Sequence, residues 1–153
     1  MISETVRARG HRNVTATHRS TFEVTRDPEI GLVADCIVAV AADKSACTLS
    51  DSYKKAAASD DAQITAIIRC GVHTDIVTGR GSAQMTFTDD HSMVFRVSNY
   101  ICGRTVMIYA DKAARGLDRG LTAALASGKE AEIELRVEHA PRPGPSFDVI
   151  FEG

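Results

Sequence analysis

The tripeptide Ala-Asp-Lys occurs twice, and its residue types suit the binding of an anion. The copies, in "AADKS" and "YADKA", centre on Asp43 and Asp111, and each follows an apolar run. If a helix begins at each aspartate, the free N–H groups of its first turn and the adjacent lysine, Lys44 or Lys112, form a site for a phosphate or carboxylate. In the alternative, the aspartates are themselves the helix N-caps and the lysines only face solvent.

Two loops carry a second set of candidate groups. The stretches "RGHRN" and "ATHR" bring imidazole and guanidinium groups, and "FTDDHS" brings two carboxylates. If these loops meet, they form a cleft suited to acid–base chemistry or to holding an anion. In the alternative, they are ordinary solvated turns. The candidate ligand-binding residues here are His11, Asn13, His18, Asp89 and Asp90.

Arg104 is a third candidate because it begins a strand that otherwise has a buried composition. A charge at such a position needs a partner, either a carboxylate such as Asp35 or a ligand.

Recognised catalytic signatures are absent from the sequence, so the catalytic residues stay unknown. There is no glycine-rich phosphate loop, no helical i, i+4 histidine pair and no CxxC pair among the four cysteines. The sequence therefore predicts no metal and no cofactor. Cys36, Cys47, Cys70 and Cys102 are expected to be reduced, partly buried thiols.

The bulk composition is that of one soluble domain spanning 1–153. With 18 basic and 20 acidic residues, the chain has no general electrostatic footprint for nucleic acid or membrane surfaces. No signal peptide or membrane-spanning run is present in the sequence, which predicts a cytoplasmic protein that binds no membrane.

An internal repeat organises these candidates. Aligning Asp43 with Asp111 also matches flanking apolar runs, and we interpret residues 2–70 and 72–138 as two copies of one unit. Gly71 lies in the turn between them, and a Pro-rich linker with a C-terminal strand occupies 139–153. At the same offset of 68 residues, "QITAIIR" lies over "AEIELRV".

Each unit is predicted as strand, glycine turn, strand, loop, strand, helix and strand. Gly10 and Gly81 are expected to form tight hairpin turns, and 36–41 and 104–109 to be buried strands. The alternation in 131–138 predicts a strand with one wet face. The predicted fold class is mainly β: a β-sandwich or barrel of two pseudo-twofold-related repeats with two short helices.

The chain resembles the archaeal domain-of-unknown-function 371 family. The residues that carry the resemblance are "GHRNVTATHRSTFEVT", "DCIVAVAADKS", "GSAQMTFTDDHSMVFRVS" and "ICGRTVMIYADKAARGLDRGL". The resemblance implies an archaeal cytosolic protein with a jelly-roll-like β fold, and it implies no activity. The chain departs from the family at Ser82, where the family usually has a histidine.

Three functions remain open at this point. The first is a domain, with or without catalytic activity, that binds a small anionic ligand such as a phosphate or nucleotide. The second is a non-catalytic homo-oligomeric scaffold or protein-interaction domain. The third and least favoured is RNA binding through Arg7, Arg9, Arg12 and Arg19, because an aromatic content of 5% leaves few platforms for base stacking.

Overall fold

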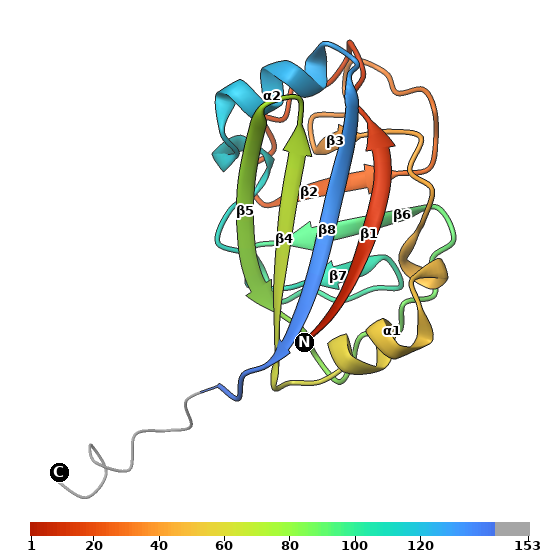
Figure 1. Ribbon diagram of the computed structural model, residues 1–153, viewed down its shortest axis with the longest axis vertical. Coiled ribbons are helices and arrows are strands. Elements are labelled where there is room, and N and C mark those ends of the chain that lie inside the picture. The colour runs from red at the N-terminus through yellow and green to blue at the C-terminus, as the bar shows by residue number, and fades with distance from the viewer. Residues whose placement is uncertain (143–153) are drawn as a thin grey trace, which may run out of the picture.

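The computed structural model describes residues 1–142, which form two four-stranded sheets and two short helices (Figure 1). The first sheet has the strand order β1 (Ile2–Arg9), β8 (Glu130–His139), β4 (Ala62–Cys70), β5 (His73–Arg80). The second has the order β3 (Ile37–Ala39), β2 (Thr21–Thr25), β6 (Ser92–Arg96), β7 (Thr105–Met107). The mainly β prediction is confirmed, and both sheets are open rather than closed into a barrel. The strand expected at the C-terminus lies outside the described residues.

The two sheets differ in how their strands pair. All pairs of the first sheet are antiparallel. In the second sheet the central β2–β6 pair is antiparallel, whereas β2–β3 and β6–β7 are parallel. A jelly roll, by contrast, is antiparallel throughout. Figure 1 shows the strands of the second sheet crossing behind those of the first.

The core lies between the two sheets and follows from the alternation of the strands. In β8, Ile133, Leu135 and Val137 are buried while the glutamates between them point outward, which confirms the predicted wet face. On the second sheet, Phe22 of β2 and Phe95 of β6 are directly opposite in register, and their rings stack with centroids 4.3 Å apart. Both phenylalanines are fully buried at the centre of the molecule.

The repeat alignment is wrong by one residue in the last strand of each half. At an offset of 68 residues, Ile64 lies over Glu132, but Ile64 is buried and Glu132 belongs to the outward face of β8. Because side chains alternate between the faces of a strand, a slip of one residue exchanges the two faces. The outward and inward positions of β4 and β8 therefore match only after a shift of one residue.

The helices begin later than the Ala-Asp-Lys segments predict. The N-cap of α1 (Asp51–Ala57) is Ser50, and that of α2 (Arg119–Ala126) is Asp118. The expectation that Asp43 and Asp111 cap these helices is therefore wrong. A short 3-10 helix, Ala46–Thr48 or Ala114–Gly116, separates each aspartate from the α-helix that follows. The buried stripe predicted for the second helix is confirmed at Ala114, Leu117, Leu121, Ala124 and Leu125.

Gly10 and Gly81 do not form hairpin turns, because β1 pairs with β8 and β5 pairs with β4. Each glycine instead lies against the end of a helix. A Cβ atom on Gly10 would stand 1.8 Å from the carbonyl oxygen of Leu125 in α2, and one on Gly81 would stand 2.1 Å from that of Ala57 in α1. Both positions need glycine for close backbone contact, which gives the same sequence signal as a turn.

The first Asp-Lys pair covers the free edge of β1. The Asp43 carboxylate accepts a hydrogen bond from the Arg7 N–H at 2.9 Å, and the Asp43 N–H donates to the Arg7 carbonyl at 2.9 Å. Lys44 Nζ then donates to the Thr5 carbonyl at 2.7 Å and to Glu4 Oε2 at 2.8 Å. The pair satisfies backbone groups that an edge strand would otherwise leave open to another chain.

The second Asp-Lys pair makes the same contacts on β5, at the opposite edge of the first sheet. The Thr78 N–H donates to the Asp111 carboxylate at 3.0 Å, and the Asp111 N–H donates to the Thr78 carbonyl at 2.9 Å. Lys112 Nζ donates to the Ile76 carbonyl at 3.2 Å and also to the carboxylate of Asp75. We call these two sets of contacts the edge clamps.

The edge clamps are expected to weaken in acid. Burial opposes ionisation of Glu4 and Asp75, but hydrogen bonds from Lys44 and Lys112 outweigh it and hold the pKa of each carboxyl below its usual value. A lowered folded-state pKa contributes stability above the unfolded-state pKa, and that contribution is lost as the pH falls through the folded value, here below about pH 4. Urea unfolding at pH 7 and pH 3 measures this loss.

Removing one clamp carboxylate identifies its share of the pH dependence. Glu4→Gln and Asp75→Asn should each lower the free energy of unfolding by about 1 kcal/mol at pH 7 and reduce the loss between pH 7 and pH 3. Asp51→Asn, at an exposed carboxylate, is the matched control and should change little. A double clamp variant with the full wild-type pH dependence would contradict the assignment.

Within residues 1–142, no helix is long and apolar enough to cross a membrane.

Candidate functional site

The structure does not bring the candidate lysines together. Lys44 is bound at the edge of β1 and Lys112 at the edge of β5, on opposite sides of the first sheet. Each already has a carboxylate partner, Glu4 or Asp75. A single anion site shared by the two lysines is therefore not formed.

His11 and Asn13 hold the loop that follows β2. His11 is almost fully buried, and its Nε2 lies 2.7 Å from Glu29 Oε2, while its Nδ1 accepts a hydrogen bond from the Asn13 N–H at 3.0 Å. The Asn13 side chain donates to the Ile30 carbonyl at 2.8 Å. Ser82 plays the corresponding local part in the second half, since its hydroxyl accepts from the Gln84 N–H at 3.1 Å.

His18 and Asp89 organise the turns that lead into β2 and β6. His18 Nδ1 accepts from the N–H groups of Ser20 and Thr21, each at 3.2 Å. Asp89 Oδ2 accepts from the Ser92 N–H at 2.9 Å and from the Ser92 hydroxyl at 3.2 Å.

The two loops therefore do not combine their side chains in one cleft. Asp90 is exposed and lies 3.9 Å from His91 Nδ1, whose ring makes a 2.8 Å contact to Asp27 through Nε2. Among the residues that the structure describes, no hydrogen bond or ion pair joins His11 or His18 to Asp89 or Asp90.

Arg104 has a carboxylate neighbour, and it is Glu23 rather than Asp35. The Arg104 guanidinium is half exposed and lies 4.0 Å from a Glu23 carboxylate oxygen, so the contact is long. The Glu23 side chain is only 15% exposed. Burial is the main cause that raises the pKa of Glu23, and Arg104 acts against it. The arginine is thus available to a further partner.

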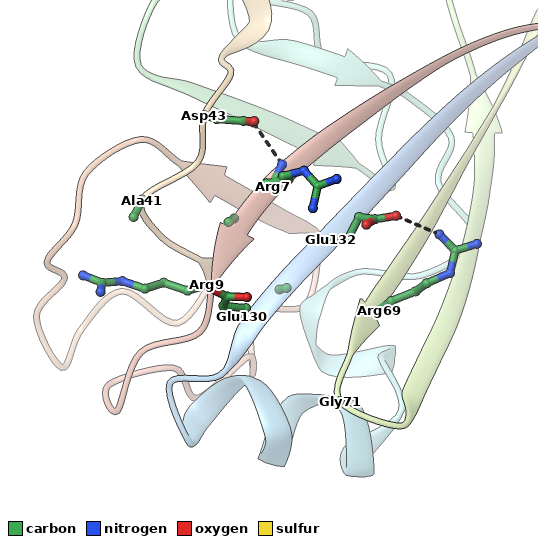
Figure 2. Close-up of a pocket in the computed structure, with 10 residues that line it drawn as sticks. Arg7, Arg9, Ala41, Asp43, Arg69, Gly71, Glu130 and Glu132 are labelled. Carbon is green, nitrogen blue, oxygen red and sulfur yellow. Dashed lines mark hydrogen bonds and ion pairs between the residues drawn. The ribbon is translucent and has the colours of Figure 1, made fainter.

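The largest hollow is a groove on the exposed face of the first sheet, shown in Figure 2. It has a volume of about 770 Å³ and runs from Asp43, beside β1, to Gly71 at the β4–β5 turn. We call it the charged groove. Its charged lining residues are Arg7, Arg9, Arg69, Asp43, Glu130 and Glu132.

The charges of this groove compensate one another. Arg69 Nη1 donates to Glu132 at 3.4 Å and to Glu134 at 3.1 Å, and the register places Arg7 opposite Glu132 on the neighbouring strand. The three arginines face three carboxylates, so the lining has no net formal charge. This balance disfavours the groove as a site for a free anion or for an RNA backbone.

A smaller hollow of about 470 Å³ has an excess of positive charge. It is lined by Arg19, Lys112 and Arg115, with Asp111 as its one carboxylate and Val97 as an apolar wall. The Arg115 N–H donates to the His18 carbonyl at 3.0 Å, which brings Arg115 next to Arg19. We call this the basic hollow.

The cations of the basic hollow differ in how far they are already neutralised. Lys112 is paired with Asp75, and Asp111 is bound to the edge of β5. Within residues 1–142, Arg19 and Arg115 have no ion-pair partner. Two guanidinium groups thus face solvent beside one hollow without a compensating carboxylate.

The sequence alone gave Arg115 no role and connected Arg19 only with RNA. The signal that indicates Arg115 is the internal comparison, because the position of Arg115 corresponds to Cys47 in the first half at the offset of 68. Their surroundings also correspond: the Cys47 N–H donates to the Asp89 carbonyl at 2.9 Å, as Arg115 does to His18. The first-half counterpart of the basic hollow lacks its arginines.

Comparison with known proteins places this architecture in a family. The family described as Domain of unknown function (DUF371) matches residues 6–138, from β1 to β8. The chain belongs to the DUF371 family. A DUF371 relative, the "Uncharacterized protein MJ0206" of Methanocaldococcus jannaschii, is 36% identical over 132 residues, which covers 86% of this chain and 97% of the relative. The predicted family resemblance is confirmed.

Proposed function

We propose that the protein binds a small anionic ligand, such as a phosphate or a nucleotide, in the basic hollow. The observation that carries the proposal is the pair Arg19 and Arg115, two guanidinium groups beside one hollow with no ion-pair partner in the described chain. Guanidinium groups donate several hydrogen bonds in a planar geometry that suits phosphate and carboxylate oxygens. Lys112 adds a third cation, and Val97 offers an apolar surface to the rest of a ligand.

The proposal gains support if the chain arose from two copies of one unit with pseudo-twofold symmetry. Each sheet has a strand order that is unchanged when the halves are exchanged, and the edge clamps repeat on β1 and β5. Four residues other than glycine adopt positive φ angles, and they form the matching pairs Ala16 and Phe87, and Ala41 and Tyr109. In such an architecture, charges present in only one half are not explained by the shared scaffold.

A thermal-shift titration tests the proposal directly. The protein is titrated with inorganic phosphate, adenosine monophosphate and citrate, since a ligand that binds only the folded state raises the unfolding midpoint with concentration. We expect a saturable rise for at least one of these anions, and a smaller rise at high salt. No rise with any anion would overturn the proposal and favour the oligomeric scaffold, which the mass of the protein in solution would then test.

Matched arginine variants locate the site. Arg115→Ala and Arg19→Ala should each weaken binding about 10-fold to 100-fold, because each removes a charge-assisted hydrogen bond. The control is Arg7→Ala in the charged groove, which should bind as the wild type does. If Arg7→Ala abolished binding while Arg115→Ala did not, the anion site would be the charged groove and the present assignment would be wrong.

A further inference from the structure

A group of chemically reactive side chains lies apart from both hollows, around the turn before β7. Cys102 is partly exposed at the start of this turn. The Arg96 guanidinium donates to Cys102 Sγ at 3.4 Å through Nη2 and to the Thr105 hydroxyl at 2.9 Å through Nε. The same guanidinium lies over the Tyr100 ring, 4.8 Å from its centroid. Arg96 is thus fixed on two sides with its charge next to the sulfur.

The backbone of the turn holds the sulfur in place. The Cys102 N–H donates to the Thr105 hydroxyl at 3.0 Å, and the Thr105 N–H donates to the Cys102 carbonyl at 3.0 Å. The Gly103 carbonyl accepts from the Thr88 N–H at 3.0 Å, and a Cβ on Gly103 would stand 2.3 Å from Thr88 Oγ1. The turn is therefore packed against a neighbouring loop and presents Cys102 in a defined orientation.

The surroundings of Cys102 favour the thiolate. Burial opposes ionisation, but hydrogen bonds from the Arg104 N–H, the Thr105 hydroxyl and the Arg96 guanidinium outweigh it and lower the pKa of Cys102 to about 7. The thiolate, not the thiol, is the nucleophile in thiol chemistry. Two other thiols differ: burial raises the pKa of Cys36 and of Cys70.

We propose that Cys102 is a modification site that undergoes thiol–disulfide exchange with low-molecular-weight disulfides carrying carboxylates. The Cys102 sulfur attacks one sulfur of the disulfide, a new S–S bond forms to the protein, and the second sulfur leaves as a thiolate. The incoming disulfide is the only oxidant that the step needs. Cys102 can act in this way because it is accessible and held beside a fixed guanidinium.

Arg104 gives the site its preference for negative charge. Its backbone N–H lies at the Cys102 sulfur, and its half-exposed guanidinium has only the 4.0 Å contact to Glu23. A carboxylate on the incoming disulfide can therefore pair with Arg104 while the sulfur atoms meet. In the alignment at offset 68, Cys36 occupies the position of Arg104, so this pairing exists in one half only.

The test compares the four thiols within one folded protein. The native chain is treated briefly with iodoacetamide between pH 5.5 and 9.5, and mass spectrometry quantifies each cysteine. We expect Cys102 to react about 10-fold or more faster than Cys36 and Cys70 at pH 7, with a midpoint near pH 7. A Cys102 rate no greater than those of Cys36 and Cys70, or a midpoint above pH 8.5, would overturn the proposal. Cys102→Ser identifies the fast phase by removing it.

Charge selectivity is tested with two disulfides. The reagents are the dicarboxylate 5,5′-dithiobis(2-nitrobenzoate) and the neutral 2-hydroxyethyl disulfide. Arg104→Gln should slow the reaction of Cys102 with the dicarboxylate at least 3-fold and leave its reaction with the neutral disulfide within 2-fold of the wild type. Equal slowing with both reagents, or no slowing with either, would refute the role of Arg104.

Arg96→Gln separates a role in ionisation from a structural one. It should move the midpoint of the iodoacetamide profile upward by about one pH unit, because it removes a charged hydrogen-bond donor from the sulfur. An unchanged midpoint in the folded variant would contradict the role of Arg96. If the variant does not fold, the wild-type profile and the Arg104 variant still decide the proposal.

Discussion

Replacement of Gly10 by alanine is expected to lower the free energy of unfolding by at least about 3 kcal/mol. The added Cβ would stand 1.8 Å from the Leu125 carbonyl oxygen and 2.5 Å from its carbonyl carbon. Both atoms belong to the backbone of α2, so no side-chain rotation relieves the clash. The Gly10 N–H also donates to the Lys129 carbonyl at 2.7 Å, so the strand cannot retreat without losing that bond.

Urea unfolding of Gly10→Ala and Gly31→Ala measures this effect against a matched control. A Cβ on Gly31 would meet no atom within 4 Å, so Gly31→Ala should change the stability by less than about 0.5 kcal/mol. Gly81→Ala should resemble Gly10→Ala, because its Cβ would stand 2.1 Å from the Ala57 carbonyl oxygen. A Gly10→Ala protein as stable as Gly31→Ala would show that the α2 contact is not as close as the structure has it.

Replacement of Phe22 by alanine is expected to cost about 3–5 kcal/mol, the usual range for a buried phenylalanine. Phe22 and Phe95 are both fully buried, and their rings are stacked with an interplanar angle of 7°. The pair joins β2 to β6 at the middle of the second sheet. Truncation of either ring therefore leaves a cavity at the centre of the core and exposes one face of the other ring to it.

A double-mutant cycle isolates the interaction between the two rings. Phe22→Leu and Phe95→Leu keep most of the apolar volume and remove the stacking, so each should cost less than the alanine variant. The coupling energy between the two leucine substitutions should be about 0.5–1.5 kcal/mol, measured by chemical unfolding of the four proteins. Strictly additive losses would contradict a direct energetic contact between the rings.

Local patterns in the sequence predicted those features that depend on side-chain periodicity. The alternation in β8 and the buried stripe of the second helix were both confirmed, because the period of a strand or helix decides which residues share a face. Gly71 was correctly placed in the β4–β5 turn, where its φ is 62°. Hydrophobic burial and local backbone geometry act over a few residues, so the sequence carries them openly.

Features that depend on distant partners could not be predicted in this way. An aspartate after a strand has the composition of a helix N-cap, but Asp43 binds the backbone of Arg7, 36 residues away in the sequence. Gly10 likewise has the signal of a hairpin turn, whereas its reason is the α2 backbone, which lies far along the chain. In both cases the residue type was informative and the partner was not.

The candidate site divides in the same manner. The sequence by itself determined that Arg19, Lys112 and Arg115 carry positive charge and that Cys102 is a thiol. Only the tertiary structure decided that Lys112 is bound by Asp75, that Arg19 and Arg115 share one hollow, and that Arg96 lies against the sulfur of Cys102. The physical reason is that charge neutralisation and thiol ionisation depend on distances of a few ångströms between side chains, and the folded arrangement of the two sheets sets those distances.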